Sequence, residues 1–420
     1  MKLLFENLAG NNKFVAVENE YITYIGNERP DGKFDRVISG KDKLLMPGLY
    51  NCHTHVPMVL FRGYTEDMPL MQWLHEKIFP AEDKLTAEDV YTASKFAIAE
   101  MLRNGIVSFT EMYNDCDRIS QAAIETGIKA NISRALMLNP SIKDNHRFDE
   151  SVDLFKNYHN TGDGRIKIDM SLHSEYLNTF EVCQEFAAYT KSIGANMHVH
   201  ISETLGEHTE CIARHNKTPA QFMYDSGVFD NPTLAAHCVH VSKEDMDIFK
   251  EKNVSVAHNP VSNLKLGSGV MDLPSMLEKG INVAFGTDGC ASNNTHDIMK
   301  EMYTAAILHK GVNMKADIIK SKDVIKMATE NGAVSQCRKD CGKIEAGCKA
   351  DLILINLDEI NNLPYYDTDS VVYSMNSSNV ALTMVDGKIL YENGEFTTLD
   401  IERLKYEMRN ISAEKYGAIK

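Results

Sequence analysis

Two histidines, His53 and His55, stand one residue apart in the stretch NCHTHVPM, directly after the apolar run LLMPGLY. On a β-strand, residues i and i+2 point to the same face of the sheet. Both imidazoles would therefore converge on one point, which is the arrangement that binds a metal ion. Two solvated histidines in a turn give the same short pattern, so the rest of the chain has to decide between these interpretations.

Other histidines and one aspartate stand at the ends of later apolar runs. These residues are His173, His200, His237, His258 and Asp288. A single histidine in such a place is most often a packed core residue. If the runs are parallel strands of one barrel, however, all their carboxyl ends face the same mouth, where the active sites of that fold lie. Convergence of this many ligand-type side chains favours a metal site.

The elements between these residues fit such a barrel. After residue 48, short β-rich runs alternate with longer helical patterns, such as the one that opens at the expected N-cap Thr86. Eight runs are expected as strands, over residues 48–55, 105–113, 129–136, 166–174, 195–202, 233–239, 253–259 and 281–288. The alternation predicts an α/β protein with a (β/α)8 TIM-type barrel. A doubly wound open sheet is the competing layout, but no G-x-G-x-x-G follows the first strand.

The two ends of the chain have a different character. Residues 1–48 and 342–397 contain short strands and tight turns, and are expected to pair into one small β-sandwich-like domain. Residues 49–341 form the predicted barrel, and an amphipathic helix is expected within residues 398–420. The segment 56–85, between the first barrel strand and its helix, is long, and long loops of this kind are usually functional.

Position along the strands and ligand chemistry select four metal ligands. His53, His55 and His200 supply imidazoles and Asp288 a carboxylate, a set that leaves a coordination position for water, as a catalytic zinc requires. His198 shares the strand face of His200 but lies deeper, so it is interpreted as a core or supporting residue. The fourth strand ends without a lysine that would bridge two ions, so one divalent metal is expected. Zinc is favoured, and Fe²⁺ or Mn²⁺ also suits these ligands.

Two further residues are candidates for the chemistry. Glu203, in the stretch HISET, follows the strand that carries His200, and an acid there can shuttle a proton between an activated water and a leaving group. His237 is then free to hydrogen-bond the water or the substrate. Because a bound metal lowers the pKa of water towards about 7, Asp288 is a candidate acceptor for the proton of that water.

Charge and composition exclude several classes of protein. The chain carries 44 basic and 59 acidic side chains, a net charge of −15, which argues against nucleic acid or an anionic membrane as a partner. No apolar stretch has the length of a signal-peptide core or a membrane span, and nine cysteines without a framework spacing fit a reduced, cytoplasmic protein. Cys337, Cys341 and Cys348 lack the spacing of a structural zinc site and are expected to be free thiols.

The ordered motifs PGLYNCHTH, HVHISET, AAHCVH, AHNPVSNLKLGSG and FGTDGCASNN resemble the amidohydrolase superfamily. Within it, the chain is similar to the S-adenosylhomocysteine/5′-methylthioadenosine deaminases. The likeness runs from the first barrel strand to the segment GKIEAGCKADL and covers nearly the whole chain. The resemblance implies a zinc ion on the four ligands named above, with Glu203 and His237 in the chemistry.

The substrate residues of that family also have counterparts in this sequence. By the resemblance, Glu82, in FPAED, would bind ribose hydroxyls, and His173 would contact the purine ring. Arg134, in SRAL, and Arg147, in HRFDE, would pair with an amino-acid carboxylate. One departure concerns the residues that follow His173, where the family often has a proline two residues later and this chain has LHSEY.

The implied reaction is hydrolytic deamination of a cyclic amidine. Water replaces the amino group at C6 of an adenine ring, Glu203 protonates a ring nitrogen, and ammonia leaves. S-adenosylhomocysteine and 5′-methylthioadenosine are the expected substrates. The same chemistry on guanine, an oxidised purine, a pterin or a chlorotriazine stays open, as does a barrel that has lost catalysis and serves as a scaffold. The sequence also leaves open whether the chain forms a homo-oligomer.

Overall fold

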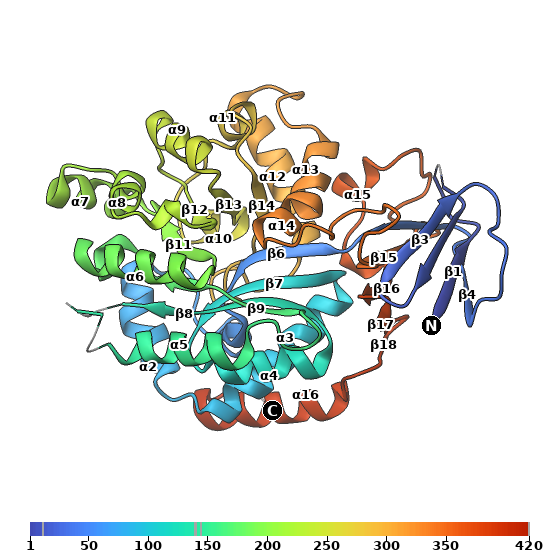
Figure 1. Ribbon diagram of the computed structural model, residues 1–420, viewed down its shortest axis with the longest axis horizontal. Coiled ribbons are helices and arrows are strands. Elements are labelled where there is room, and N and C mark those ends of the chain that lie inside the picture. The colour runs from blue at the N-terminus through green and yellow to red at the C-terminus, as the bar shows by residue number, and fades with distance from the viewer. Residues whose placement is uncertain (11, 138–140, 143–144, 419–420) are drawn as a thin grey trace.

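Parallel strands form a barrel at the centre of the molecule (Figure 1). The computed structural model describes residues 1–10, 12–137, 141–142 and 145–418. Neighbouring strands pair in the order β14-β13-β12-β11-β10-β8-β7-β6, with β9 beside β8. The barrel strands are β6 (Leu49–Thr54), β7 (Ile106–Tyr113), β8 (Lys129–Leu136), β9 (Ile166–Ile168), β10 (Met170–Leu172), β11 (Met197–Ile201), β12 (Thr233–His237), β13 (Ser255–His258) and β14 (Val283–Phe285). The prediction of a TIM-type barrel is confirmed.

All eight predicted strands form, and the fourth is divided in two. β9 ends before Asp169, whose carboxylate accepts hydrogen bonds from two asparagine side chains, and β10 continues after it. In the described part of the chain no ladder joins β14 to β6. Instead, the backbone N–H groups of Thr287 and Asp288 donate to the carbonyl of His53, at 3.1 and 2.9 Å. The barrel therefore closes next to residues that the sequence predicts as metal ligands.

Helices surround the barrel. The longer ones are α3 (Ala87–Arg103), α4 (Cys116–Thr126), α5 (His146–Tyr158), α6 (Phe180–Ile193), α7 (Leu205–His215), α9 (Lys243–Lys252), α12 (Ile298–Asn313) and α13 (Ser321–Ala328). Shorter ones are α8 (Pro219–Asp225), α10 (Pro260–Lys265), α11 (Leu273–Glu278), α14 (Glu330–Ser335) and α15 (Ser370–Tyr373). As predicted, Thr86 caps α3: its side chain accepts the N–H of Asp89, whose own side chain accepts the N–H of Thr86. Such a capping box satisfies N–H groups that a first helical turn leaves free.

The long segment between β6 and α3, residues 56–85, is here called the entrance segment. It folds into four short helical turns, which are η1 (Val56–Phe61), α1 (Leu70–Trp73), η2 (Leu74–Ile78) and α2 (Phe79–Glu82). Several of its apolar side chains are buried, among them Phe61, Ile78 and Trp73, the only tryptophan of the sequence. The segment is therefore packed against the barrel rather than open to solvent.

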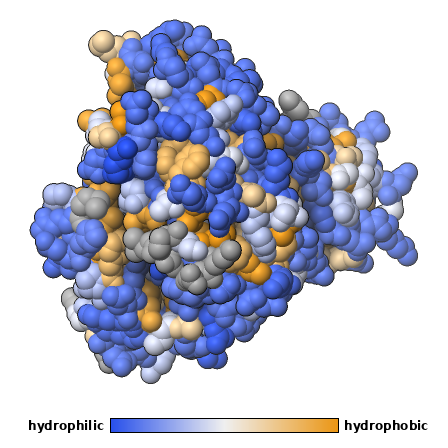
Figure 2. Space-filling view, turned by 60° about the vertical axis from the view of Figure 1, so that its left-hand side comes forward, coloured by the Kyte–Doolittle hydropathy of each residue, from blue (hydrophilic) through white to orange (hydrophobic). Residues whose placement is uncertain are grey.

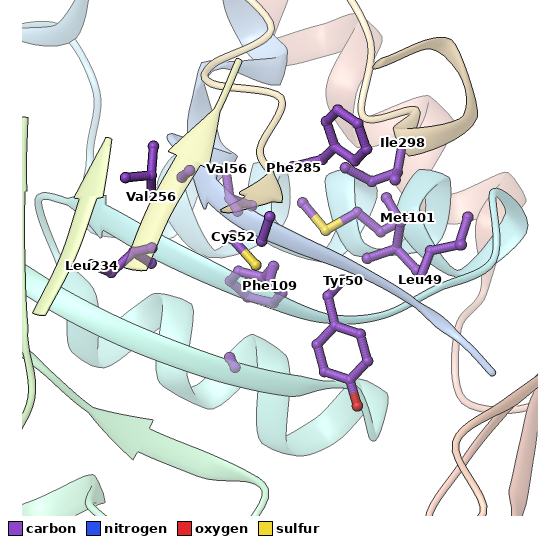
Figure 3. Close-up of a cluster of buried hydrophobic side chains, with 14 of the residues drawn as sticks. Leu49, Tyr50, Cys52, Val56, Met101, Phe109, Leu234, Val256, Phe285 and Ile298 are labelled. Atoms are coloured by element: carbon purple, nitrogen blue, oxygen red, sulfur yellow. The ribbon is translucent and has the colours of Figure 1, made fainter. Parts of the chain in front are cut away.

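Apolar side chains fill the space between the strands and the helices (Figure 3). β6 is buried at every position. Figure 3 shows Cys52 of β6 in a cluster with Phe109 of β7, Val256 of β13 and Phe285 of β14. Close packing of this kind resists displacement of the strands, and it therefore fixes the positions of the side chains at their carboxyl ends.

Both ends of the chain build a second unit beside the barrel, at the right of Figure 1. Its two sheets have the orders β3-β2-β1-β4 and β18-β17-β16-β15-β5. Their strands are β1 (Lys2–Glu6), β2 (Phe14–Glu18), β3 (Tyr21–Gly26), β4 (Arg36–Ser39), β5 (Lys43–Pro47), β15 (Leu352–Asn356), β16 (Val380–Val385), β17 (Lys388–Glu392) and β18 (Glu395–Phe396). Side chains of both sheets, such as Phe5 and Leu352, share one apolar core. The predicted sandwich-like unit from both chain ends is confirmed, whereas the division of the chain at residues 48 and 341 stays a prediction.

A buried group of charges, here called the basal ion cluster, joins this unit to the amino end of the barrel. It consists of Lys129, the first residue of β8, with Asp351, Asp386 and Arg338. Lys129 donates to both carboxylates, at 2.6 Å from Asp386 Oδ1. Arg338 donates to two backbone carbonyls of the barrel. Burial alone would lower the pKa of Lys129, but the two carboxylates raise it above its ordinary value.

The last helix, α16 (Ile401–Tyr416), runs along the lower edge of the molecule in Figure 1 and packs on α3. It lies within the predicted range 398–420, of which residues 419–420 fall outside the described ones. Among the helices that the structure describes, none has both the length and the apolar character needed to cross a membrane.

Candidate metal centre and active site

Four histidines and an aspartate meet at the carboxyl end of the barrel. His53 lies on β6 and His55 directly after it, His200 lies on β11, His237 ends β12, and Asp288 follows β14. The ring centroid of His53 lies 5.0 Å from that of His55, 4.9 Å from that of His200 and 5.1 Å from that of His237. The structure therefore brings together side chains from four different strand ends.

The backbone turns sharply where these strands end. Ser202, His237 and Asp288 have φ angles of 46°, 69° and 60°, in the left-handed region that residues other than glycine rarely adopt. Such a conformation costs about 1–3 kcal/mol and persists where the surrounding structure enforces it, often at functional sites. Gly286 permits the close approach of β14 to β6, because a Cβ atom there would lie 2.8 Å from the backbone nitrogen of His53.

Two of the histidines are held through their Nδ1 atoms by backbone carbonyls. Nδ1 of His55 donates to the carbonyl of Met112 at 2.6 Å, and Nδ1 of His200 donates to the carbonyl of His173 at 2.8 Å. A carbonyl only accepts hydrogen bonds, so the proton sits on Nδ1 in the neutral ring. Each Nε2 therefore keeps its lone pair for a metal ion.

The other two rings are held by side chains. Nδ1 of His53 lies 3.0 Å from Nε2 of His198, and Nδ1 of His237 lies 2.9 Å from Oδ1 of Asn263. His198 is fully buried beneath the centre. It therefore has the supporting place that its position on the strand indicates.

The two carboxylate oxygens of Asp288 have different neighbours: one lies near two histidines, and the other accepts hydrogen bonds from two hydroxyl groups. Its Oδ1 lies 3.3 Å from Nε2 of His55 and 3.6 Å from Nε2 of His53. Its Oδ2 accepts hydrogen bonds from Ser262 at 2.7 Å and from Ser292 at 2.8 Å. Burial would raise the pKa of this carboxyl, but His55 and the other neighbours hold it below its ordinary value. The group is thus ionised, as a metal ligand has to be.

The residues present fit a divalent metal ion. Burial and the neighbouring imidazoles lower the pKa of His53 and of His200, so both rings are neutral, as imidazoles that bind a metal have to be. Nε2 of His53 is buried and has no hydrogen-bond partner within the described residues. Leaving such an atom unpaired costs roughly 1–3 kcal/mol. Three imidazoles and a carboxylate are the ligands of a catalytic zinc site, and a zinc ion would take up the free lone pair.

Two groups of three residues have the spacing of metal ligands at this place. One is His53 with His55 and Asp288, and the other is His53 with His200 and His237. Because His53 belongs to both groups, they describe one centre, which supports a single ion. His237 lies as close to the centre as the predicted ligands do, a feature that the sequence does not indicate.

Glu203 lies at the edge of the centre. Its Oε2 is 4.0 Å from Nε2 of His237, and the hydroxyl of Ser268 donates to its Oε1 at 3.3 Å. The carboxylate of Glu207 accepts the backbone N–H of Glu203 at 2.7 Å and that of Ser202 at 2.9 Å. Glu207 therefore fixes the turn that aims Glu203. Burial, together with the charge of Glu203, raises the pKa of Glu207 to about 7.

A cavity of about 410 Å³ lies next to the metal centre. Its walls are mainly apolar, and the entrance segment supplies Leu70, Trp73, Leu74 and Phe79. His200, Glu203, His237 and Asp288 line it on the side of the metal centre. In Figure 2, apolar residues show near the middle of an otherwise mostly hydrophilic face. A largely apolar cavity with a few convergent polar groups is typical of a site for a small molecule.

Three of the four predicted substrate residues line the cavity, namely Glu82, His173 and Arg134. Glu82 ends α2 of the entrance segment, and burial raises the pKa of its carboxyl to about 7. His173 follows β10, with its ring 4.7 Å from that of His200 and its Nδ1 3.1 Å from the hydroxyl of Ser174. Burial lowers the pKa of His173 to about 3, so its ring is neutral. Both residues have the place that contact with a substrate requires.

The two predicted arginines are close enough to repel each other, and they differ in their bonds. Arg134 lines the cavity and donates to Glu150 at 2.5 Å and to the side chain of Asn114. Arg147 has a buried Nη1 without a hydrogen-bond partner among the described residues. Burial and the charge of Arg134 lower the pKa of Arg147 to about 10. Of the two arginines, only Arg134 is among the residues that line the cavity, and Arg147 lies outside that lining.

The stretch LHSEY departs from its family pattern without disturbing His173. Ser174 contacts His173, as described above. Glu175, which stands where the family often has proline, is buried and accepts a hydrogen bond from Arg214 of α7. An ion pair thus holds the turn that a proline would otherwise stiffen.

Other residues that the sequence singles out lie away from the centre. Nε2 of His258 lies 3.3 Å from Nε2 of His309 on α12, so its ring points out of the barrel. Cys337, Cys341 and Cys348 are free thiols, as predicted, and none of them belongs to a group with metal-ligand spacing in the described part of the chain.

The sequence does not indicate the residues that hold the polar side chains of the site in place. They are Ser262, Asn263, Ser268, Ser292 and Glu207. The motif AHNPVSNLKLGSG contains Ser262, Asn263 and Ser268. Serine and asparagine are common in loops, however, and their spacing alone does not indicate a contact with the site. Only their contacts across the barrel mouth give them a role.

The chain is similar to known proteins over nearly its whole length. A model of the amidohydrolase family matches residues 44–390. A 5-methylthioadenosine/S-adenosylhomocysteine deaminase from Thermoanaerobacter pseudethanolicus is 40% identical, over 97% of this chain and 98% of that protein. One from Acetivibrio thermocellus is 41% identical, over 95% and 94%. Among solved structures, a zinc-bound adenosine deaminase from Xanthomonas campestris is similar with a TM-score of 0.93 and 28% identity, over 99% of this chain and 98% of that chain.

Proposed function

The chain belongs to the amidohydrolase family, and from this membership we propose that it is a metal-dependent deaminase of adenosine derivatives. Its substrates are S-adenosylhomocysteine and 5′-methylthioadenosine, which react with water to give the inosyl products and ammonia. One observation carries the proposal. The imidazoles of His53, His55 and His200 and the carboxylate of Asp288 stand beside Glu203 at a cavity of about 410 Å³.

The ligands of the metal are His53, His55, His200 and Asp288, with zinc as the favoured ion. When bound, the ion lowers the pKa of a water molecule towards about 7 and so supplies a hydroxide nucleophile at neutral pH. The Nδ1 bonds of His55 and His200 support this assignment, because they leave Nε2 free for coordination. Fe²⁺ and Mn²⁺ suit the same donor atoms.

The protein's own acids move the protons. The ionised carboxylate of Asp288 accepts a proton from the attacking water. Glu203 donates a proton to the ring nitrogen next to C6, which makes that carbon a better electrophile. The proton that Asp288 took from the water passes to the amino group, which leaves as ammonia, and the hydroxyl added at C6 returns a proton to Glu203 as it becomes the carbonyl. His237, with Nε2 at 4.0 Å from Glu203, hydrogen-bonds the oxygen that is added at C6.

The other contacts orient the substrate. His173 packs against the purine ring, and Glu82 accepts hydrogen bonds from the ribose hydroxyls. Arg134 and Arg147 bind the carboxylate of the homocysteine group, which 5′-methylthioadenosine lacks. Arg134 supports this role because it lines the cavity, and Arg147, outside that lining, has an unpaired Nη1 that an anion would satisfy.

The test is ammonia release by the metal-loaded enzyme with S-adenosylhomocysteine, 5′-methylthioadenosine, adenosine, guanine and a pterin. We expect kcat/KM to be highest for S-adenosylhomocysteine, or equal for it and 5′-methylthioadenosine, and lower for adenosine. Arg147→Ala should lower kcat/KM for S-adenosylhomocysteine about ten-fold, because a charge-assisted hydrogen bond is lost, with little change for 5′-methylthioadenosine. Arg118→Ala, on the half-exposed face of α4, is the matched control.

Two outcomes would revise the proposal. Equal losses on both nucleosides in Arg147→Ala would make that arginine a structural residue. Turnover of a bare ring such as guanine, without turnover of any adenosine derivative, would assign the protein to another branch of its family.

We also propose that the protein works in the reducing environment of the cytoplasm. All nine cysteines are unpaired, and seven of them are buried. A protein that matures in an oxidising compartment usually has disulfides or few free thiols.

A further inference from the structure

The end of the last helix contacts the entrance segment on both sides of Glu82. The hydroxyl of Tyr416 donates to the carbonyl of Ala81 at 2.9 Å. Nζ of the preceding residue, Lys415, donates to the carbonyl of Lys84 at 2.8 Å. The final turn of α16 therefore fixes the backbone directly before the candidate ribose-binding carboxylate and two residues after it.

The ring of Tyr416 also packs against the start of the entrance segment. Its centroid lies 5.3 Å from that of Phe61 and 5.6 Å from that of Tyr64, with the ring planes steeply inclined in both pairs. Nζ of Lys84 lies 6.0 Å from the same centroid. One side chain thus touches the beginning and the end of a segment that is 30 residues long.

Lys415 extends this connection to a rigid part of the barrel. Its ammonium group forms an ion pair with Asp89 in the first turn of α3. Asp89 is also half of the capping box with Thr86, which follows the entrance segment directly. Since α16 packs along α3, its end is held by a long helix of the barrel wall and can itself hold a less stable element.

The entrance segment lacks the internal features that would fix it. Its elements η1, η2 and α2 have four to six residues each, and none has a side chain that caps its first turn. Helical turns this short are not stable in water by themselves, and their positions depend on contacts with the rest of the fold. The contacts from Tyr416 and Lys415 are of this kind.

We propose that Tyr416 and Lys415 are positioning residues for substrate binding. They hold Glu82, and with it the apolar wall that contains Trp73, against the cavity. The C-terminal helix thereby sets the affinity for the nucleoside, while the metal centre and Glu203 set the rate of the chemical step. The identity of the nucleoside rests on the proposed function, but the contacts of Tyr416 and Lys415 with the entrance segment do not.

Steady-state kinetics of Tyr416→Phe test the connection, because this change removes the hydroxyl and keeps the ring. We expect KM for 5′-methylthioadenosine to rise about three- to ten-fold, as loss of one hydrogen bond predicts, with kcat and metal content unchanged. Tyr406→Phe is the matched control, since Tyr406 lies on the same helix and is 65% exposed. An unchanged KM, or a fall in kcat without a change in KM, would overturn the proposal.

The fluorescence of Trp73 gives a second test that needs no turnover. Trp73 is the only tryptophan of the sequence and is 5% exposed, so the emission of the protein reports the packing of the entrance segment. Tyr416→Ala should shift this emission to longer wavelength, and Tyr406→Ala should not. An unshifted spectrum in Tyr416→Ala would overturn the proposal. A shifted spectrum in an enzyme that fails to deaminate any nucleoside would keep the connection and refute only the substrate.

Discussion

The two ends of the barrel both bury charged and polar groups, and they treat these groups in opposite ways. At the amino end, Lys129 of the basal ion cluster meets two carboxylates, which raise its pKa. At the carboxyl end, Nε2 of His53 lies 3.6 Å from Oδ1 of Asp288 but has no hydrogen-bond partner among the described residues, and burial lowers the pKa of that ring. Burial of a polar group is therefore not the mark of the active site. The mark is the convergence of several ligand-type side chains on one point, as in the groups of His53 with His55 and Asp288 and of His53 with His200 and His237.

The contrast also divides stability from function. The buried ion pairs of Lys129 with Asp351 and Asp386 hold two parts of the fold together. A buried nitrogen that is left unpaired lowers the stability of the metal-free protein, and the bound ion restores it. Substitutions at the carboxyl end of the barrel should therefore remove metal and activity. Substitutions at the amino end should lower the free energy of unfolding instead.

Loss of a metal ligand should have the largest effect. In Asp288→Ala or His200→Ala, we expect metal content to fall from about one ion per chain to nearly none. Activity should fall by far more than the roughly 10–100-fold that loss of a supporting residue causes. His258→Gln, which alters a strand-end histidine outside the centre, should keep the metal. Elemental analysis measures this, and two tightly bound ions per chain in the wild type would contradict the single centre.

Removal of the proton shuttle should come next. Glu203→Gln should keep the metal and bind substrate, but lose roughly 10²–10⁴ in kcat, because the amide cannot transfer a proton. Single-turnover kinetics separate this loss from binding. Glu181→Gln, on the exposed face of α6, is the control. Activity within a few-fold of the wild type would show that another group moves the proton.

A substitution in the basal ion cluster, at the amino end of the barrel, should lower the folding stability and leave activity unchanged. Lys129→Met leaves Asp351 and Asp386 buried without their cation, and we expect the free energy of unfolding in urea to fall by about 3–5 kcal/mol. Metal content and kcat/KM of the folded enzyme should stay near those of the wild type. Lys95→Met, which removes a partly exposed ion pair with Glu125, should cost about 0–1 kcal/mol. A large loss of activity in folded Lys129→Met would break the separation of the two ends.

The smallest effect is expected at a hydroxyl group that donates a hydrogen bond to a proposed metal ligand. Ser292→Ala removes one of the two hydrogen bonds to Oδ2 of Asp288 and leaves the bond from Ser262. Metal affinity, measured by competition with a chelator, should fall about ten-fold. Ser192→Ala on α6 serves as control. An unchanged affinity would mean that Ser262 alone orients the carboxylate.

The barrel and the convergence of histidines at its mouth were predictable because both depend on local patterns. Alternation of β-rich and helical runs indicates the strands, and a parallel barrel then places His53, His200 and Asp288 at one mouth. His258 shows the limit of this argument. It ends a strand as His200 does, but its ring contacts α12, because a shift of one residue at a strand end turns a side chain to the opposite face.

The supporting residues were not predictable for a different reason. Ser262 reaches Asp288 across 26 residues of chain, and Tyr416 reaches Ala81 across 335. Serine and tyrosine occur throughout the sequence, and nothing in their neighbours indicates such a contact. Their roles arise from tertiary packing alone.

The pairing of β5 with β15 has a consequence for the synthesis of the chain. Leu45 of β5 lies opposite Leu354 of β15, so the two partners are about 300 residues apart. At roughly 5–20 residues per second, β5 has to wait about 15–60 s on the ribosome before β15 has been made. During that time its apolar residues and free strand edge are exposed to other chains. We therefore expect the sandwich to form last and the nascent protein to depend on chaperones, which proteolysis of ribosome-stalled chains that end before and after residue 356 would reveal.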